Sequence, residues 1–222
     1  LPIFDGLVVI GGDGSFRGAR DLSLKGIPCI GIPGTIDNDI ASSDYTVGFD
    51  TAVNTVMDMV DKLRDTSQSH DRCSIVEVMG RRCGDIALHA GIACGAVAIL
   101  VPEVPFSIDS IIEKMQRTLR TGKKHFIIIV AEGVTSVGGV GTVHDIAEEI
   151  EARTGVESRA TVLGHVQRGG APSARERVLA SEMGYHAVEL LEQGIGNRVV
   201  VNHDNKIVDY DILEALQIKK QF

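Results

Sequence analysis

The chain has 222 residues, a formal net charge of −8 and a hydrophobic content of 44%. The acidic balance argues against a general nucleic-acid-binding protein, which carries a basic face, and the hydrophobic content argues against disorder. No apolar run reaches the roughly 18 residues that a membrane helix needs, so we expect a globular, cytoplasmic protein of one or two domains without a membrane partner. The four cysteines contain no C-x-x-C pair, which favours buried, reduced thiols over a zinc site or disulfides.

Short apolar runs alternate with helical patterns along the chain. Helices are expected to begin near Ser15, to span Phe49–Leu63, to follow Ser107 as far as Leu119, and to span Ala174–Glu192. The expected strands are Leu7–Ile10, Ile27–Ile32, Ser74–Val78, Val97–Val101, Phe126–Ala131 and Val199–Val201. Most of these runs are continuously apolar, which suits strands buried on both faces. The alternation predicts an α/β fold with mainly parallel sheets between helices, and such sheets bind ligands beyond the carboxyl ends of their strands. The glycine-rich segment Val134–Thr142 is predicted to be a surface loop.

The segment Gly11–Ser15, with the sequence GGDGS, follows the first expected strand. Glycines there allow backbone N–H groups to reach phosphate oxygens, and the start of the following helix favours anions. Because a carboxylate among phosphates is repelled unless a cation lies between them, Asp13 indicates Mg²⁺. The segment is not a dinucleotide fingerprint, since Arg17 stands where a glycine is required, and it is not a Walker loop. The alternative is a tight strand-to-helix turn with Asp13 as its cap.

The segment Pro33–Asp39, with the sequence PGTIDND, follows the second expected strand. In an extended loop alternate residues point the same way, about 6.6 Å apart. The side chains of Thr35, Asp37 and Asp39 are therefore expected to share one face. Paired carboxylates in such a place suit a general base beside a phosphate and metal site, and the alternative is an Asx-rich turn.

Other strand ends carry further polar candidates. Arg81 offers a planar fork for phosphate, and the carboxylate of Glu132 can accept hydrogen bonds from sugar hydroxyls. Arg159, His165 and Arg168 lie in one segment that can bracket a dianionic phosphate. Each feature alone is as consistent with an ordinary surface loop, but together they point to phosphoryl transfer onto a phosphorylated sugar.

The segments GGDGS, PGTIDND, VEVMGR, AEG and RATVLGHVQRGG, in this order, resemble the bacterial type of ATP-dependent 6-phosphofructokinase. The resemblance extends from about Asp5 to Phe222 and includes GFDTAVNT, KLRDTSQSHDR and VPEVPFS. It implies two three-layer α/β domains, the first one incomplete. The nucleotide domain would be 1–48 plus 167–212, and the sugar-phosphate domain would be 49–166 plus 213–222. The implied reaction is transfer of a phosphoryl group from MgATP to the 1-hydroxyl of fructose 6-phosphate, in a glycolytic, allosteric homotetramer.

The resemblance also implies roles for the residues of the first two motifs. Asp37 would be the base that takes the hydroxyl proton, supported by Thr35 and Asp39, and Arg81 would stabilise the transferring phosphoryl group. The residues lining the ATP phosphates would be Gly12, Asp13, Gly14 and Ser15, with Asp13 also holding Mg²⁺.

Two further sets follow from the same resemblance. The sugar phosphate would contact Thr35, Asp37, Met79, Gly80, Arg81, Glu132, His165 and Arg168, together with Arg72 and Arg159 from a neighbouring subunit. An effector site would include Arg64, Gly95, Lys123 and Lys124. That site departs from the family at Val97, where an acid is usual, and at Thr121, where a basic residue is usual.

The family's N-terminal segment, which has its own glycine-rich loop, does not precede Leu1. We therefore expect these 222 residues alone to be weakly active or inactive, with part of a sheet unpaired. Two alternatives remain open: a pyrophosphate-dependent phosphofructokinase, and a non-catalytic fragment that binds only the sugar phosphate. Gly14 and Gly34 match the ATP-using branch, because the pyrophosphate-using branch typically has Asp and Lys there.

Overall fold

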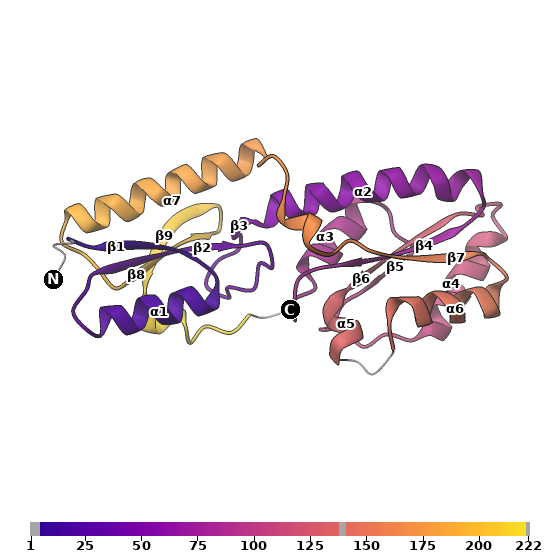
Figure 1. The fold of residues 1–222 in the computed structure, drawn as a ribbon, viewed down its shortest axis with the longest axis horizontal. Coiled ribbons are helices and arrows are strands. Elements are labelled where there is room, and N and C mark those ends of the chain that lie inside the picture. The colour runs from indigo at the N-terminus through magenta and orange to yellow at the C-terminus, as the bar shows by residue number, and fades with distance from the viewer. Residues whose placement is uncertain (1–4, 138–140, 221–222) are drawn as a thin grey trace. The chain divides into compact units, whose positions relative to one another are not determined.

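The computed structural model describes residues 5–137 and 141–220, and these fold into two compact units (Figure 1). The first unit combines the described residues up to Asp50 with those from Ala171 onward. The second unit is Thr51–Gly170, so it is inserted into the chain of the first.

The C-terminal segment differs from the expected division of the chain. We assigned 213–222 to the second domain, but the described part of this segment lies in the first unit. Ile212 and Ala215 are buried in the same cluster as Phe16, and Lys220 Nζ donates to the backbone oxygen of Asn38 at 2.5 Å. Burial of these apolar side chains and this hydrogen bond hold the segment on the first unit.

The first unit has helices on both faces of one sheet. The sheet order is β1-β2-β8-β9, with β3 (Val47–Gly48) beside β2, where the strands are β1 (Leu7–Gly11), β2 (Cys29–Thr35), β8 (Arg198–His203) and β9 (Lys206–Asp211). The helices α1 (Asp13–Ser23) and α8 (Ile212–Ala215) pack against one face, where Phe16 and Val199 are buried. On the other face α7 (Ala174–Glu192) packs Met183 against Ile30. The three layers follow from strands that are apolar on both sides.

Only the last strand of this sheet is antiparallel to its neighbour. The turn between β8 and β9 consists of Asp204 and Asn205, whose φ values of 50° and 58° lie in the left-handed region. Asn and Asp tolerate this conformation, and two such residues form the tight hairpin that joins right-twisted strands. The polar run from His203 to Lys206 masked this hairpin in the sequence.

The second unit contains a fully parallel sheet. Its order is β5-β6-β4-β7, where the strands are β4 (Cys73–Val78), β5 (Ala98–Leu100), β6 (Phe126–Ala131) and β7 (Ser158–Val162). In Figure 1, α2 lies over one face of the sheet, and α4 and α6 lie over the other. The helices are α2 (Phe49–Ser69), α3 (Asp85–Ala93), α4 (Ile108–Leu119), α5 (Glu132–Val137) and α6 (Val143–Thr154). All six residues of β6 are buried, as its continuous apolar sequence predicts.

The predicted α/β class with mainly parallel sheets is confirmed, and several boundaries differ. α1 begins at Asp13 rather than near Ser15, and α2 continues past Leu63 to Ser69. Part of the predicted loop Val134–Thr142 is helical instead: α5 continues to Val137, Val134 is buried within it, and Thr142 is the N-cap of α6. Residues 138–140 of that loop lie outside the described residues.

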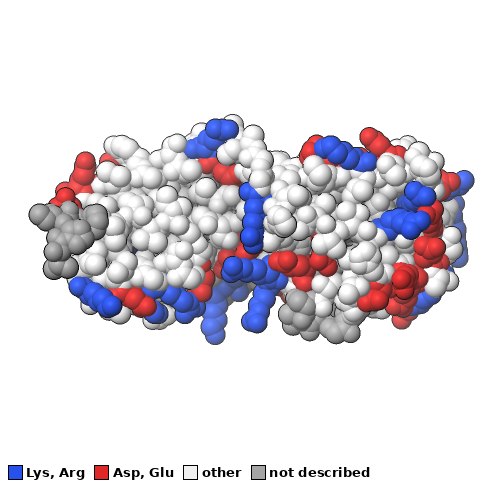
Figure 2. Space-filling view, viewed as in Figure 1, with Lys and Arg blue, Asp and Glu red and all other residues white. Residues whose placement is uncertain are grey.

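β1 does not have both faces buried, because it lies at the end of the sheet order among the described strands. Val8 is 39% exposed and Ile10 is 67% exposed. Figure 2 shows that the visible face of this unit, between α7 and α1, is largely uncharged. An apolar edge of this kind is prone to pair with other chains.

The four cysteines are free and buried, as predicted. Burial raises the pKa of the Cys73 thiol to about 12, so this thiol stays protonated near neutral pH. No helix within the described ranges is both long enough and apolar enough to cross a membrane.

Candidate functional site

The two motifs of the first unit lie side by side at one edge of its sheet. β1 and β2 are parallel and Gly11 pairs with Pro33, so both following loops leave the sheet at the same edge. A Cβ atom added to Gly12 would lie 3.7 Å from the Cβ atom of Thr35. The first two predicted motifs are therefore adjacent in the structure.

The GGDGS loop leads directly into α1. Gly11 must be glycine, because a Cβ atom there would lie 2.2 Å from Ser15 Oγ. At Gly14 an added Cβ atom would meet no atom within 4 Å, so open space lies beside the first turn. The N-cap is Gly12 and has no side-chain cap, which overturns the alternative that Asp13 caps the helix. Unsatisfied N–H groups at this helix start favour an anion.

Asp13 lies in the first turn of α1, with its side chain 47% exposed. Arg17, one turn later, donates from Nε to Asp13 Oδ2 at 2.8 Å. The hydrogen bond to Asp13 and the charge of its carboxylate raise the pKa of Arg17. This contact orients the carboxylate at the surface, where it can reach a ligand.

The PGTIDND segment is a turn and not an extended loop. β2 ends at Thr35, a turn follows at Ile36 and Asp37, and Asn38 has a φ of 50°. The expected alternation of residues 35, 37 and 39 is therefore wrong, because a left-handed residue interrupts the period of two. Asp37 is 6% exposed, and its backbone N–H donates to Thr35 Oγ1 at 3.2 Å. The turn thus buries Asp37 and holds its backbone on the hydroxyl of Thr35.

Asn38 holds this turn against the next segment of chain. Its Oδ1 accepts from Thr46 N at 3.0 Å, and its Nδ2 donates to Asp44 O at 3.2 Å. Thr46 Oγ1 in turn donates to Thr35 O at 2.6 Å. These bonds compensate the left-handed backbone of Asn38, a kind of strain that occurs at functional sites.

Asp39 carries a polar atom that the described residues leave unpaired. Its Oδ1 is buried and accepts no hydrogen bond from the described part of the chain. A buried carboxylate oxygen without a partner costs free energy, and a bound donor or cation removes that cost. This observation supports a ligand or ion near the turn.

In the second unit, the loops after β4 and β6 meet through Glu132. β4 and β6 are parallel, and their last residues Val78 and Ala131 are paired. Glu132 Oε1 accepts from Gly80 N at 3.1 Å and from Arg81 N at 2.6 Å. Its Oε2 forms no hydrogen bond with any other described residue and can accept from a ligand.

The backbone of this loop is unusual at two positions. Gly80 has a φ of 138°, and an added Cβ atom would lie 2.3 Å from Cys83 O, so only glycine fits. Arg81 has a φ of 54° and is exposed. The Glu132 carboxylate stabilises this left-handed residue and presents its side chain at the sheet edge.

The segment after β7 contacts the loop after β4. Its 3₁₀ helix η1 (Gly164–Arg168) carries the exposed His165 and Arg168. Between them Gln167 is fully buried, accepting from Met79 N at 3.1 Å and donating to Gly164 O at 2.8 Å. The structure therefore brings together the candidates of three strand ends.

Arg72 and Arg159 lie at the other end of these strands. Arg72 immediately precedes β4 and Arg159 is near the start of β7, so the length of a strand, roughly 17 Å, separates them from Arg81. Both bind Glu157: Arg72 Nε donates to Oε2 at 2.7 Å, and Arg159 Nη2 donates to Oε1 at 2.6 Å. Hydrogen bonds from the two arginines lower the pKa of Glu157.

The four candidate effector residues fall into smaller groups. Arg64 donates to the backbone oxygen of Cys94, next to Gly95, whose φ is 62°. Lys124 pairs with Asp71 at 3.5 Å. Among the described residues, no group of three or more His, Cys, Asp or Glu side chains is arranged to hold a metal ion.

Sequence reasoning missed three residues whose side chains hydrogen-bond the backbone of other segments. Gln167 and Asn38 stand inside recognised motifs, but their partners lie elsewhere and no spacing reveals them. Glu176 is buried at 4% exposure and accepts from Gly48 N. A lone carboxylate in a helical pattern gives no signal of such a contact.

Comparisons with known proteins agree with these observations. A family model described as phosphofructokinase matches residues 3–191. A protein of Clostridium tetani (strain Massachusetts / E88) named "ATP-dependent 6-phosphofructokinase" is 60% identical over 98% of this chain and 66% of its own length. A protein of the same name from Bacillus cytotoxicus is 57% identical over 97% of this chain and 66% of its length. The chain thus spans just under two thirds of these relatives.

A solved structure of phosphofructokinase from Saccharomyces cerevisiae is similar in fold. It matches with a TM-score of 0.86 and 34% identity, covering 96% of this chain and 33% of the yeast chain. Together with the family model and the two relatives, this match shows that the chain belongs to the phosphofructokinase family.

Proposed function

We propose that the chain is the larger part of an ATP-dependent 6-phosphofructokinase. This enzyme transfers the γ-phosphoryl group of MgATP to the 1-hydroxyl of fructose 6-phosphate, giving fructose 1,6-bisphosphate and ADP. The observation that carries the proposal is the 60% identity, over 98% of this chain, to a protein of that name. The clusters of polar residues at the strand ends of each unit support it, because phosphoryl transfer depends on positioning and charge stabilisation.

In the first unit, Asp37 is the proposed general base. Its burial beside Thr35 Oγ1 suits a carboxylate that takes the proton of the sugar hydroxyl. Thr35 and Asp39 support it, and Gly12, Gly14 and Ser15 line the phosphates.

Asp13 is the proposed ligand of Mg²⁺. One carboxylate plus substrate phosphates is a usual Mg²⁺ environment, and the half-exposed side chain of Asp13 fits it. Bound Mg²⁺ would neutralise charge on the phosphates.

In the second unit, Arg81 is proposed to stabilise the transferring phosphoryl group. Glu132 Oε1 positions the Gly80–Arg81 backbone, while Oε2 accepts from the sugar. His165 and Arg168 are proposed to bind the 6-phosphate, and their exposure on η1 supports this role.

Arg72 and Arg159 lie a strand length from that cluster, which supports a role toward a second subunit. We propose that they bind the 6-phosphate held by a neighbouring copy in a homotetramer. We also propose that the enzyme is cytoplasmic and that Arg64, Gly95, Lys123 and Lys124 contribute to an effector site.

The test compares the complete enzyme, of which this chain is the proposed larger part, with its Asp37→Asn variant. A coupled assay for fructose 1,6-bisphosphate offers ATP and pyrophosphate in turn, and calorimetry measures binding of fructose 6-phosphate and MgATP. We expect turnover with ATP, reduced by about 10²–10⁴-fold in the variant, or roughly 3–5 kcal/mol of barrier. Binding of the sugar phosphate should persist in this variant. The control is Asp58→Asn, which replaces an exposed carboxylate on α2 and should change neither turnover nor binding of the sugar phosphate.

Three results would overturn parts of the proposal. Near-normal turnover of Asp37→Asn would remove Asp37 as the base. Turnover with pyrophosphate alone would establish the other phosphoryl donor. Binding of fructose 6-phosphate without MgATP binding or turnover would establish a non-catalytic sugar-phosphate-binding chain.

Arg168→Ala should mainly raise the KM for the sugar phosphate.

A further inference from the structure

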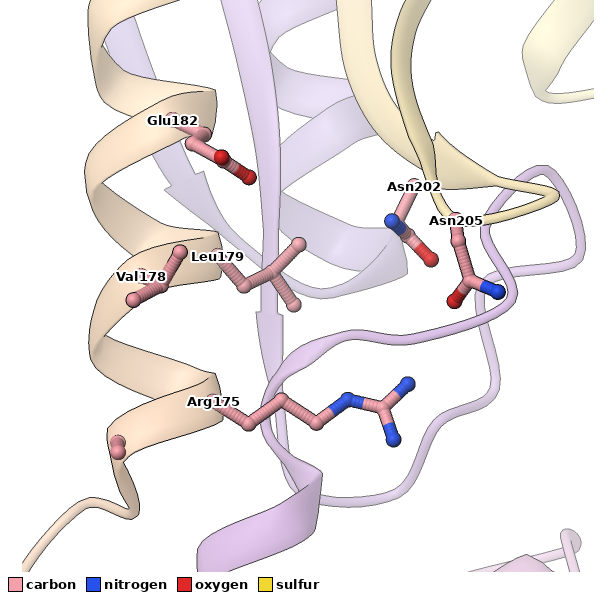
Figure 3. A pocket seen from close by; sticks show the side chains of 7 residues that line it. Arg175, Val178, Leu179, Glu182, Asn202 and Asn205 are labelled. Carbon is pink, nitrogen blue, oxygen red and sulfur yellow. The ribbon is translucent and has the colours of Figure 1, made fainter.

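A pocket in the first unit lies apart from all the residues of the proposed active site. It is formed between α7 and the β8–β9 hairpin and has a volume of about 340 Å³ (Figure 3). That volume is at the lower end of the range for small-molecule sites. Its lining includes Arg175, Val178, Leu179, Glu182, Asn202 and Asn205.

Arg175 supplies a fixed positive charge to the pocket. Its guanidinium carbon lies 3.8 Å from the centroid of the Tyr45 ring, and Tyr45 packs edge-on against Phe49 at 5.4 Å. This stacking holds the guanidinium without using its N–H groups, which stay available as a fork for an anion. Across residues 5–137 and 141–220, no carboxylate forms an ion pair with Arg175.

Asn202 supplies a side-chain amide to the lining of the pocket. The residue is 8% exposed, and its backbone is bound to Ser43 Oγ at 3.1 Å and to Asp44 N at 2.8 Å. Its side-chain amide forms no hydrogen bond with another described residue, yet it lines the pocket. The amide is therefore available to pair with a ligand inside the pocket.

The remaining lining residues place an apolar surface between the positive Arg175 and the negative Glu182. In Figure 3, Asn202 and Asn205 on the hairpin side lie across from Arg175, while Leu179 points from α7 into the space between them. Glu182 lies two helical turns beyond Arg175, roughly 10 Å along α7. Negative charge at that far end disfavours a ligand with a second anionic group.

We propose that this pocket binds a small organic monocarboxylate whose far end is neutral or cationic. The carboxylate pairs with the Arg175 fork and accepts from the amides of Asn202 and Asn205. The carbon chain packs on Leu179, and a donor group at the far end is directed toward Glu182. This site would operate whether or not the phosphoryl transfer proposed above is correct.

The experiment uses two probes of equal chain length, 5-aminopentanoate and glutarate, which differ at one end. Binding is measured by NMR titration of the whole chain, with inorganic phosphate as a third probe. We expect 5-aminopentanoate to bind at least tenfold more tightly than glutarate or phosphate. Arg175→Gln should weaken its binding at least tenfold, and Glu182→Gln should largely remove the discrimination against glutarate.

Two variants serve as controls for the fold. Arg177→Gln changes an arginine of the same helix that donates to Pro172 O and does not line the pocket, so it should leave binding unchanged. Asn205→Gly removes an exposed amide of the hairpin, keeps the left-handed turn and should weaken binding without unfolding the unit. Equal binding of the two five-carbon probes, or binding unaffected by Arg175→Gln, overturns the proposal. Equal or tighter binding of phosphate would make the site a general anion site and overturn the assignment to carboxylates.

Discussion

Glu157 accepts hydrogen bonds from both Arg72 and Arg159, and this contact makes stability depend on pH. The two arginines hold the pKa of Glu157 below its usual 4.5. A depressed pKa in the folded state adds stability that is present above the unfolded pKa and is lost as pH falls through the folded pKa. The added stability should therefore be constant above about pH 4.5 and disappear below it.

The measurement is urea unfolding of the unmodified chain and Glu157→Gln between pH 7 and pH 3. We expect the variant to be less stable at pH 7 and the difference to shrink as the solution is acidified below pH 4.5. Glu148→Gln, an exposed carboxylate on α6, is the matched control. A difference that grows on acidification would contradict this account of Glu157.

Gln167 connects two loops and has no access to solvent. Replacing it with alanine removes the hydrogen-bond partner of Met79 N and of Gly164 O, which are both part-buried. Unfolding free energy should fall by about 1–3 kcal/mol, as measured by denaturant titration. Gln116→Ala, on the exposed face of α4, should cost far less. Equal losses for the two variants would show that the buried hydrogen bonds contribute little.

At the scale of elements, the start of α6 is fixed by a reciprocal cap. Thr142 Oγ1 accepts from Asp145 N at 3.3 Å, and Asp145 Oδ2 accepts from Thr142 N at 2.6 Å. Thr142→Ala removes the side-chain half of this capping box and should lower the unfolding free energy by about 1 kcal/mol. Thr118→Ala, within α4, is a control that lacks a capping role. A stability loss no larger than that of the control would argue against the cap.

The elements that the sequence predicted share one property, which is an apolar pattern strong enough to decide the structure locally. Phe126–Ala131 was found with its exact bounds because burial on both faces leaves no polar residue in it. The composition of Ser158–Val162 does not predict a strand, because Ser, Arg and Thr in its sequence SRATV are polar. This segment is a strand because it pairs with β4. Strand β9 was missed for the same reason, since its partner and not its composition determines it.

The candidate site shows the same division between local and long-range information. Glycines at positions 11 and 80 were recognised, because tight turns require them locally. Glu132 and its backbone donors are separated by 51 and 52 residues, and Gln167 lies 88 residues from Met79. No spacing rule relates such residues, so their positioning roles emerge only from the fold. The left-handed Asn38 was likewise hidden within an apparently extended motif.

At the scale of the molecule, the second unit is continuous in sequence and has its own sheet and core. Each of the four strands of its sheet pairs only with strands of the same unit, and β4 and β6 are almost entirely buried. A chain of residues 51–170 should therefore fold alone. We expect cooperative urea unfolding and native-like circular dichroism in the near and far ultraviolet.

A matched comparison is available for this fragment. The same measurement on residues 51–156, which keep α6 and lack β7, should show loss of cooperativity, because β4 then has an unpaired edge. Gradual unfolding of 51–170 itself would show that this unit depends on the rest of the chain.

The insertion of one unit within the other has a consequence for how the protein emerges from the ribosome. Ser43 and Asn202, 159 residues apart, are joined by a buried hydrogen bond, and β2 pairs directly with β8. At translation rates of about 5–20 residues per second, β2 waits roughly 8–30 seconds for its neighbour. The inserted unit is released earlier and has time to fold first. Chaperone demand during synthesis should therefore concentrate on the segment with β1 and β2, because β2 stays without this partner until β8 has been synthesised.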